Sequence, residues 1–213
     1  MSATDFAARS RPGLPALTML VVASSWSAEA PAAEPLTPQQ VIETTAFALA
    51  ESVAARRSRL ETDTVERKAL VDELLLPRFD LESSCRLMLR QHWATASPEQ
   101  RRHFVDSFYR FLVASYGDAL TGFRSDTLTV VPTDDAVIGG SARVRTRLKL
   151  ANSKLYQVDF YMRRDNGSWR IVDVLVEGVS YVRTWRTDFG LEIRANGLDA
   201  VIARLEEVAA HEP

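Results

Sequence analysis

Apolar residues recur at helical spacing through the first half of the chain. This pattern predicts helices over residues 38–59, 65–75 and 80–93. Thr37 and Gln40 form a capping box around a proline at the first helical position, which marks where the first helix begins. The first half of the chain is therefore predicted to be helical.

A fourth, longer helix has the clearest start signal in the chain. Ser97 stands at the cap position, a proline follows it, and Gln100 is placed to reach back to the cap amide. Apolar side chains then recur at spacings of three, four and seven, which gives one wide aromatic stripe. Its positions are Phe104, Phe108, Phe111, Leu112, Ser115 and Ala119, widened by Tyr109, Val113 and Tyr116. Such a stripe fits either a packed core or the wall of a ligand pocket.

From residue 126 the repeat of apolar positions changes from 3.6 residues, typical of a helix, to 2 residues, typical of a strand. Val144, Thr146, Leu148 and Leu150 alternate with arginines and a lysine, which predicts an antiparallel strand with one solvated face. Residues 156–162 continue the alternation. After an Asp-Asn-Gly turn, residues 169–176 return as the next strand.

The closing segment is predicted to be helical again, over residues 179–193 and 198–209. Helices, then an antiparallel sheet of about four strands, then helices predict an α+β fold in which a curved sheet closes over helices as a half-open cone. Such a cone can enclose a pocket. The pattern alone does not select one topology.

The N-terminus has the layout of a secretory signal. Arg9 and Arg11 precede an apolar stretch over residues 14–25, and small residues suited to cleavage follow it. We expect residues 1–32 to be a signal peptide for export and residues 33–213 to form a single domain. The alternative is a disordered N-terminal tail rich in alanine and proline.

Composition narrows the classes of function. A formal net charge of -2 argues against a general nucleic-acid binder, which needs a basic surface to displace counterions. The single cysteine, Cys85, cannot form an internal disulfide, and we expect it to pack as a small apolar residue. None of the three histidines has metal-ligand spacing with another histidine or a cysteine, so no metal is indicated. The sequence also lacks a glycine-rich phosphate loop and a nucleophile elbow.

Two carboxylates inside strands are candidates for acid–base chemistry. Strand parity places Asp159 on the solvated side of the sheet, whereas Asp173 has Arg170 and Arg186 as candidate partners. Structural pairing is the favoured interpretation of both. Glu177 is expected to order the corner between strand and helix.

The stretch 156–189 resembles the signature of the MlaC/Ttg2D family. The residues that carry the resemblance are Trp169, Asp173, Val174, Glu177, Gly178, Val179, Ser180, Arg186 and Phe189. The similarity extends over most of residues 38–207. Two positions depart from the family pattern: Leu89-Arg90 stands where a Leu-Gly pair is common, and Trp185 replaces a usual tyrosine.

The resemblance implies a fold and a function. Members of the family are periplasmic carriers of phospholipid that maintain outer-membrane lipid asymmetry, and their fold is a distant relative of the NTF2-like cone. The implied partners are phospholipid, an inner-membrane ABC transporter complex with its MCE-domain subunit, and an outer-membrane lipoprotein-porin complex. No cofactor, no nucleic-acid partner and no enzymatic activity are implied.

On this basis we predict which side chains contact lipid tails. They are Phe104, Phe108, Phe111, Leu112 and Tyr116 on the long helix, Val144, Leu148, Val158 and Phe160 on the sheet, and Val174, Val176, Val179 and Val182 near the corner. Three alternatives stay open. They are a carrier of a polycyclic lipid such as a hopanoid, an enzyme on an NTF2-like cone that acts on a small apolar ligand, and an interaction domain with a filled core.

Overall fold

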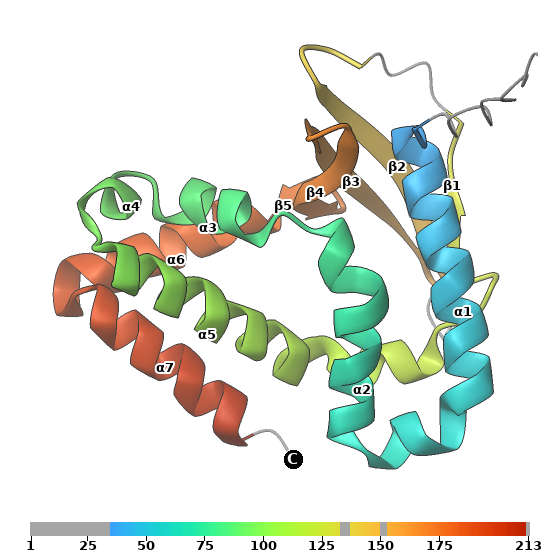
Figure 1. Ribbon diagram of the computed structural model, residues 1–213, viewed down its shortest axis with the longest axis horizontal. Coiled ribbons are helices and arrows are strands. Elements are labelled where there is room, and N and C mark those ends of the chain that lie inside the picture. Colours follow the sequence, from blue (N-terminus) through green and yellow to red (C-terminus); the bar gives the residue numbers. More distant parts are fainter. Residues whose placement is uncertain (1–34, 133–136, 150–152, 212–213) are drawn as a thin grey trace, which may run out of the picture. The chain divides into compact units, whose positions relative to one another are not determined.

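A computed structural model of the chain describes residues 35–132, 137–149 and 153–211 (Figure 1). The signal peptide predicted for residues 1–32 lies outside this part of the chain, as does Leu150. The expected α+β class is confirmed, with helices, then a sheet, then two helices along the chain. Within the described ranges, no helix combines the length and the hydrophobicity that a membrane crossing requires.

The first helix, α1 (Pro38–Thr62), begins where its capping box predicts. The Thr37 amide donates to Oε1 of Gln40 at 2.8 Å, and the Gln40 amide donates to Oγ1 of Thr37 at 3.2 Å. These bonds satisfy two amides that a helix start would otherwise leave unpaired.

The second predicted helix has three parts. An α-helical part, α2 (Thr64–Leu70), widens into a π-helical turn, η1 (Val71–Leu75), and then tightens into a 3-10 turn, η2 (Leu76–Arg78). Pro77 explains the change, because it lacks an amide proton for the carbonyl four residues earlier and its ring crowds that carbonyl. The π-helical turn has consequences for the site, since two of its residues line the cavity described below.

The third predicted helix is broken in two. α3 (Leu81–Leu89) and α4 (Gln91–Thr95) are separated by Arg90, whose backbone has φ 47° and ψ -113°. A residue with a Cβ atom adopts this conformation only with strain, whereas glycine adopts it readily. The prediction of one helix over residues 80–93 was therefore wrong at Arg90, where the chain turns from α3 into α4.

The remaining helices enclose an aromatic core. They are α5 (Pro98–Tyr116), followed by a 3-10 turn η3 (Gly117–Gly122), then α6 (Tyr181–Asn196) and α7 (Leu198–His211). Side-chain bonds from Gln100 to Asp199 at 2.9 Å and between His103 and Glu206 at 2.7 Å show that α5 and α7 run parallel. Phe104, Phe108 and Phe189 are buried between these helices and α3.

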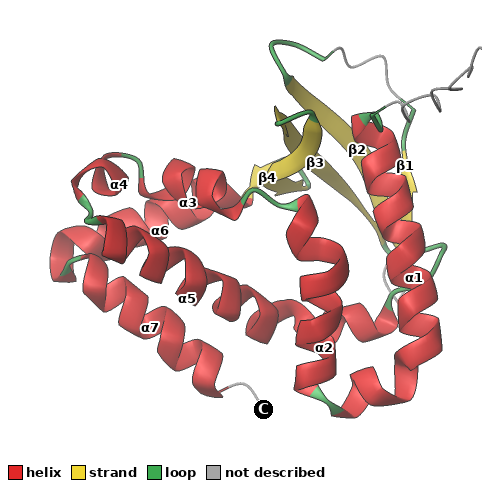
Figure 2. Cartoon of the chain, viewed as in Figure 1, coloured by secondary structure: helices red, strands yellow, loops and turns green. Residues whose placement is uncertain are grey.

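Among the described residues, the sheet has five antiparallel strands in sequence order, one more than expected; Figure 2 shows how the sheet lies against the helices. They are β1 (Leu128–Val130), β2 (Ser141–Lys149), β3 (Leu155–Asp165), β4 (Ser168–Val176) and β5 (Val179–Ser180). The fifth strand was predicted as the start of the last-but-one helix, which instead begins at Tyr181. Val41 and Ile42 of α1 pack on one face of the sheet against Val144 and Met162.

Candidate functional site

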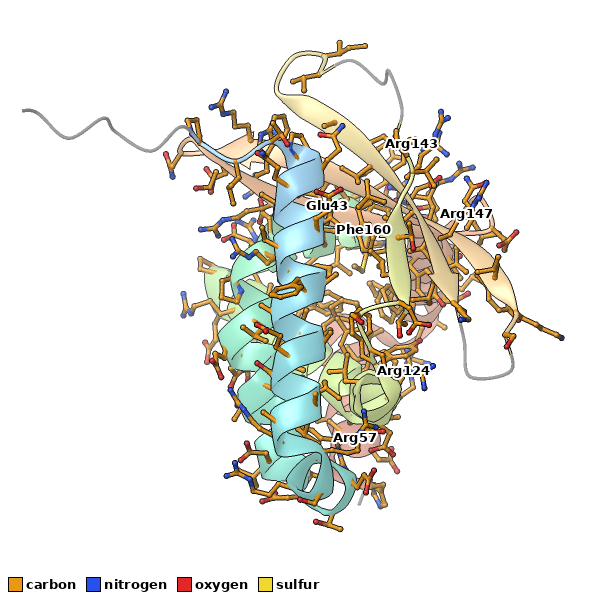
Figure 3. The ribbon with its side chains drawn as sticks, turned by 90° about the vertical axis from the view of Figure 1, so that its right-hand side faces the viewer. Glu43, Arg57, Arg124, Arg143, Arg147 and Phe160 are labelled. Carbon is orange, nitrogen blue, oxygen red and sulfur yellow. The ribbon has the colours of Figure 1, made fainter. Side chains whose placement is uncertain are left out.

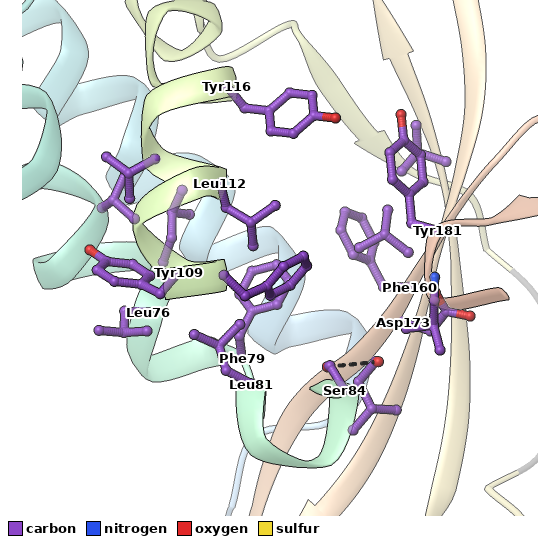
Figure 4. Close-up of a pocket in the computed structure, with 18 of the residues that line it drawn as sticks. Leu76, Phe79, Leu81, Ser84, Tyr109, Leu112, Tyr116, Phe160, Asp173 and Tyr181 are labelled. Carbon is purple, nitrogen blue, oxygen red and sulfur yellow. Dashed lines mark hydrogen bonds between the residues drawn. The ribbon is translucent and has the colours of Figure 1, made fainter. Parts of the chain in front are cut away.

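An apolar cavity of about 450 Å³ lies among α5, the segment that links α2 to α3, the inner face of the sheet and the start of α6 (Figure 4). Its walls are almost wholly hydrocarbon. The lining residues are Val71, Leu75, Leu76, Phe79, Leu81, Ser84, Met88, Phe108, Tyr109, Leu112, Val113, Tyr116, Gly117, Ala119, Leu120, Leu128, Leu148, Val158, Phe160, Val172, Asp173, Val174, Val176, Tyr181, Val182 and Trp185.

Most residues that the sequence nominated for lipid contact lie on these walls. They are Phe108, Leu112, Tyr116, Leu148, Val158, Phe160, Val174, Val176 and Val182. They come from α5, from three neighbouring strands and from α6, and the fold gathers them around one space (Figure 4). Strand parity explains the sheet contribution, since Val158 and Phe160 point to the same face as their cross-strand partners Val176 and Val174.

Four nominated residues are absent from the lining. Phe104 is fully buried in the helical core, with its ring 5.5 Å from that of Phe189. Phe111 packs against the same core from its edge. Val144 is buried under α1, and Val179 is 59% exposed on the two-residue strand. A periodic stripe shows which side chains face inward, but it does not separate a packed interior from a hollow one.

Sequence reasoning missed the wall formed by the segment that links α2 to α3. Leu75, Leu76 and Phe79 reach the cavity because the π-helical and 3-10 turns rotate them away from a straight helical face. Phe79 is also held to the sheet by a bridge to Ile171. The run of leucines before Pro77 was the available signal, since it is too continuous for a one-sided helix.

One wall of the cavity is also the surface of the aromatic core. Phe108 is 1% exposed, and its ring lies 4.8 Å from that of Trp185 at an interplanar angle of 84°. Edge-to-face contacts of this kind add to the stabilisation from burial. Phe108 and Trp185 therefore hold the helices together and face the cavity at once.

A two-residue hairpin loop joins β4 to β5, just before the corner at which the chain enters α6. Glu177 has φ 50° and Gly178 has φ 80°, and positive values at both positions are typical of a type I′ turn. The Glu177 carboxylate accepts the Gln157 amide of β3 at 2.6 Å, which offsets the strain of its backbone. Glu177 thus orders the corner, as expected.

Asp173 holds the start of α6 in place. Its carboxylate accepts the Ser180 hydroxyl at 2.5 Å and the Val182 amide at 3.1 Å. The expected arginine partners are engaged elsewhere: Arg170 lies 4.0 Å from Asp165, and Arg186 donates to the Leu87 carbonyl at 3.0 Å. The prediction that Asp173 pairs with an arginine was wrong. The Val182 amide and the capping Ser180 hydroxyl are nearer to its carboxylate than either guanidinium.

The chain is similar in sequence to known proteins. The family model described as MlaC protein matches residues 43–207. The chain belongs to the MlaC family. It is 26% identical over 166 residues to the toluene tolerance protein Ttg2D of Pseudomonas putida, and the matched region covers 76% of each protein. It is 23% identical over 179 residues to the intermembrane phospholipid transport system binding protein MlaC of Haemophilus influenzae. This matched region covers 81% of this chain and 82% of that protein.

A solved structure shares the fold. It is the phospholipid-binding protein of Ralstonia solanacearum in complex with a phospholipid, with a TM-score of 0.75 and 21% sequence identity. The match covers 82% of this chain and 98% of that one. The α+β architecture with an open antiparallel sheet is therefore common to this chain and the Ralstonia solanacearum protein.

The opposite face of the sheet in this MlaC family member carries charged side chains. Figure 3 shows Arg143 and Arg147 on the side away from α1 and Phe160 on the side toward it. Asp159, expected to be solvated, is 0% exposed. Nε of Arg143 donates to Oδ2 of Asp159 at 3.1 Å, and the side-chain amide nitrogen Nε2 of Gln157 donates to the same oxygen at 3.1 Å. Strand parity predicted the correct face for Asp159, but the prediction that its side chain is solvated was wrong. Long neighbouring side chains cover this short one on the outer face of the sheet.

The thiol of Cys85 lies in the helical core. Burial raises the pKa of the Cys85 thiol, with smaller contributions from the charges of Glu82 and Asp80. This keeps the thiol protonated and packed in the core, as expected of a small apolar residue. Among the described residues, no group of three His, Cys, Asp or Glu side chains could hold a metal ion.

Proposed function

We propose that this protein is a carrier of phospholipid whose acyl tails occupy the apolar cavity. The observation that carries this proposal is the cavity of about 450 Å³ with hydrocarbon walls, in a chain of the MlaC family. Two similar proteins support the choice of cargo. One is named as a binding protein of an intermembrane phospholipid transport system, and the other is in complex with a phospholipid.

The magnitude of tail burial supports a carrier with an enclosed cavity. Two acyl tails contain about 30 methylenes, and exposing them to water at ~0.8 kcal/mol each would cost about 24 kcal/mol. This cost exceeds the largest binding free energies of non-covalent complexes, about 20 kcal/mol. A protein that left the tails in water could therefore not extract a lipid from a bilayer. The apolar walls of the cavity reduce this cost because they replace the hydrocarbon environment of the bilayer.

We place this carrier in the periplasm, exported by the N-terminal signal. There it would exchange phospholipid with an inner-membrane ABC transporter complex that has an MCE-domain subunit and with an outer-membrane lipoprotein-porin complex, and so sustain outer-membrane asymmetry. A bilayer and an apolar cavity solvate tails similarly, so transfer between docked partners is nearly balanced. Direction is therefore set by the partners and not by the affinity of the carrier.

The alternative of an enzyme has less support at this site. A general base needs a carboxylate or an imidazole within reach of a substrate in the cavity. Asp173 is the carboxylate among the lining residues, and its oxygens are engaged by Ser180 and Val182. Recognition of an apolar ligand is the chemistry that this arrangement favours.

Native mass spectrometry of the protein purified without detergent tests the proposal. We expect a bound mass that organic extraction identifies as a phospholipid. A polycyclic lipid would favour the hopanoid-type carrier instead. Protein that is bare and that takes up no lipid from added phosphatidylglycerol vesicles would refute the carrier proposal. It would leave the filled-core and enzyme alternatives.

A further inference from the structure

Five of the cavity's lining residues carry a hydroxyl or carboxylate group, and the protein itself satisfies three of these. The Ser84 hydroxyl donates to the Val172 carbonyl at 2.9 Å. The Tyr109 hydroxyl donates to the Asp72 carboxylate, and Asp173 is held by Ser180 and Val182 as described above. These groups have no donor left for a ligand, because each is already used in holding two elements together.

Tyr116 and Tyr181 are the other two. Both line the cavity, and neither hydroxyl has a hydrogen-bond partner among residues 35–132, 137–149 and 153–211. Tyr116 is the last residue of α5, and Tyr181 is the first residue of α6. Tyr116 is 46% exposed, which puts it where the cavity meets solvent. Two free hydroxyl donors thus stand at the open end of a site whose other hydroxyl and carboxylate groups are paired.

The two phenols lie on opposite sides of this end. Figure 4 shows the Tyr116 ring reaching from α5 toward Tyr181 on the far side. Burial raises the pKa of Tyr116, and the negative charge that Tyr181 carries when it is ionised adds to the rise. At neutral pH Tyr116 is therefore a neutral donor.

We propose that the hydroxyls of Tyr116 and Tyr181 form the polar end of the cavity and donate hydrogen bonds to acceptor oxygens at the junction between the tails and the head group of a lipid. The acceptors are the ester carbonyls or the phosphate, which share this chemistry. This inference rests on the carrier function proposed above and deepens it. Tails would fill the apolar walls, while the head group would extend into solvent past the tyrosines.

The pair has a consequence for selectivity. Neutral phenols donate to an oxygen acceptor whatever head group lies beyond it, so the site would accept phospholipids of different head groups. A pure hydrocarbon, which has no acceptor at this position, would leave both donors unpaired when it displaces water from them. Selection would therefore act on the linkage of the lipid and not on its head group.

Replacing both tyrosines by phenylalanine tests the inference. Tyr116→Phe with Tyr181→Phe removes two hydroxyls and keeps both rings. The matched control is Tyr161→Phe, since Tyr161 is 38% exposed and is not among the lining residues. The full chain, stripped of lipid, is titrated with monomeric dioctanoyl phosphatidylglycerol, with its ether-linked analogue and with decane. Binding is followed by tryptophan fluorescence, because Trp185 lines the cavity.

We expect each single substitution to weaken binding of the ester lipid about tenfold and the double variant about a hundredfold, since a hydrogen bond of this kind contributes about 1.4 kcal/mol. Decane should bind the double variant as well as it binds the parent protein, which also shows that the cavity is intact. The control should match the parent throughout. Equal losses for ester and ether lipids identify the phosphate as the acceptor. A loss confined to the ester lipid identifies the carbonyls.

A double variant that binds the ester lipid within about twofold of the parent protein would overturn the inference and leave the carrier function standing. A parent protein that binds none of the three probes would instead refute the carrier function itself. The two failures are thus distinguished in one set of titrations.

Discussion

A charge placed on the cavity wall tests the lipid site most directly, and Leu112→Asp is the substitution to make. Leu112 is half-buried on α5, and in Figure 4 its side chain points into the space that Phe160 faces from the sheet. Phe108→Asp is less informative. Phe108 is buried in the aromatic core, so a charge there would unfold the empty protein as well as expel the cargo.

The magnitude follows from protonation. In the empty, open cavity the new carboxyl is ionised, but under hydrocarbon it must take up a proton, since burying an unpaired charge costs more. Protonating a carboxyl of ordinary pKa, about 3.9, at pH 7 costs about 4 kcal/mol. Lipid retention should therefore fall about a thousandfold at pH 7 and recover about tenfold for each pH unit of acidification toward pH 4.

The neutral isostere Leu112→Asn is the matched control. It loses the apolar contact and buries an amide, which costs about 1–3 kcal/mol at every pH in this range. The assay incubates each protein with phosphatidylglycerol vesicles at pH 7, 5.5 and 4 and measures the lipid that it retains. Equal retention by the Asp and Asn variants at pH 7, or a loss in the Asp variant that acid leaves unchanged, would refute placement of Leu112 against the tails.

Three further predictions concern stability and reactivity. Arg90→Gly should stabilise the protein by about 1 kcal/mol, or about 2–4 °C in Tm, because glycine relieves the strained turn between α3 and α4; an unchanged or lower Tm would contradict the strain. Arg143→Ala should lower the free energy of unfolding by about 3 kcal/mol, since it leaves the buried Asp159 without its guanidinium, whereas the exposed Arg147→Ala should change it by less than about 0.5 kcal/mol. Similar urea midpoints for these two variants would count against the buried pair. Cys85, whose pKa is raised by burial, should react with a thiol reagent at pH 8 only as fast as the protein unfolds, and rapid labelling of the native state would show that the thiol is accessible.

The starts of helices could be predicted from the sequence because local chemistry determines them. Thr37 with Gln40, and Ser97 with Gln100, form capping boxes that the structure confirms. Strand parity likewise identified which face of the sheet Phe160 would occupy. In each case residues within a few positions of one another carry the information.

Features that depend on distant residues were beyond local reasoning. Whether Phe104 packs in a core or lines a cavity depends on Phe189, which lies 85 positions later in the chain and is 5.5 Å away by ring centroid. The break at Arg90 was hidden because arginine is a good helix former in an apolar pattern that continues through it. The burial of Asp159 depends on Arg143 of the neighbouring strand.

The motif that signalled the family is explained by the corner and not by reaction chemistry. Gly178 allows the tight hairpin, and Asp173 and Ser180 fix where α6 begins. Because α6 begins at that point, Tyr181 and Val182 face the cavity. Loss of Asp173 would therefore move the polar end of the cavity and Val182 with it, while leaving the walls formed by α5 and the sheet in place. The lipid site thus depends on a carboxylate whose oxygens are bound by Ser180 and Val182, which explains why the strongest signal in the sequence lies at the corner that positions α6.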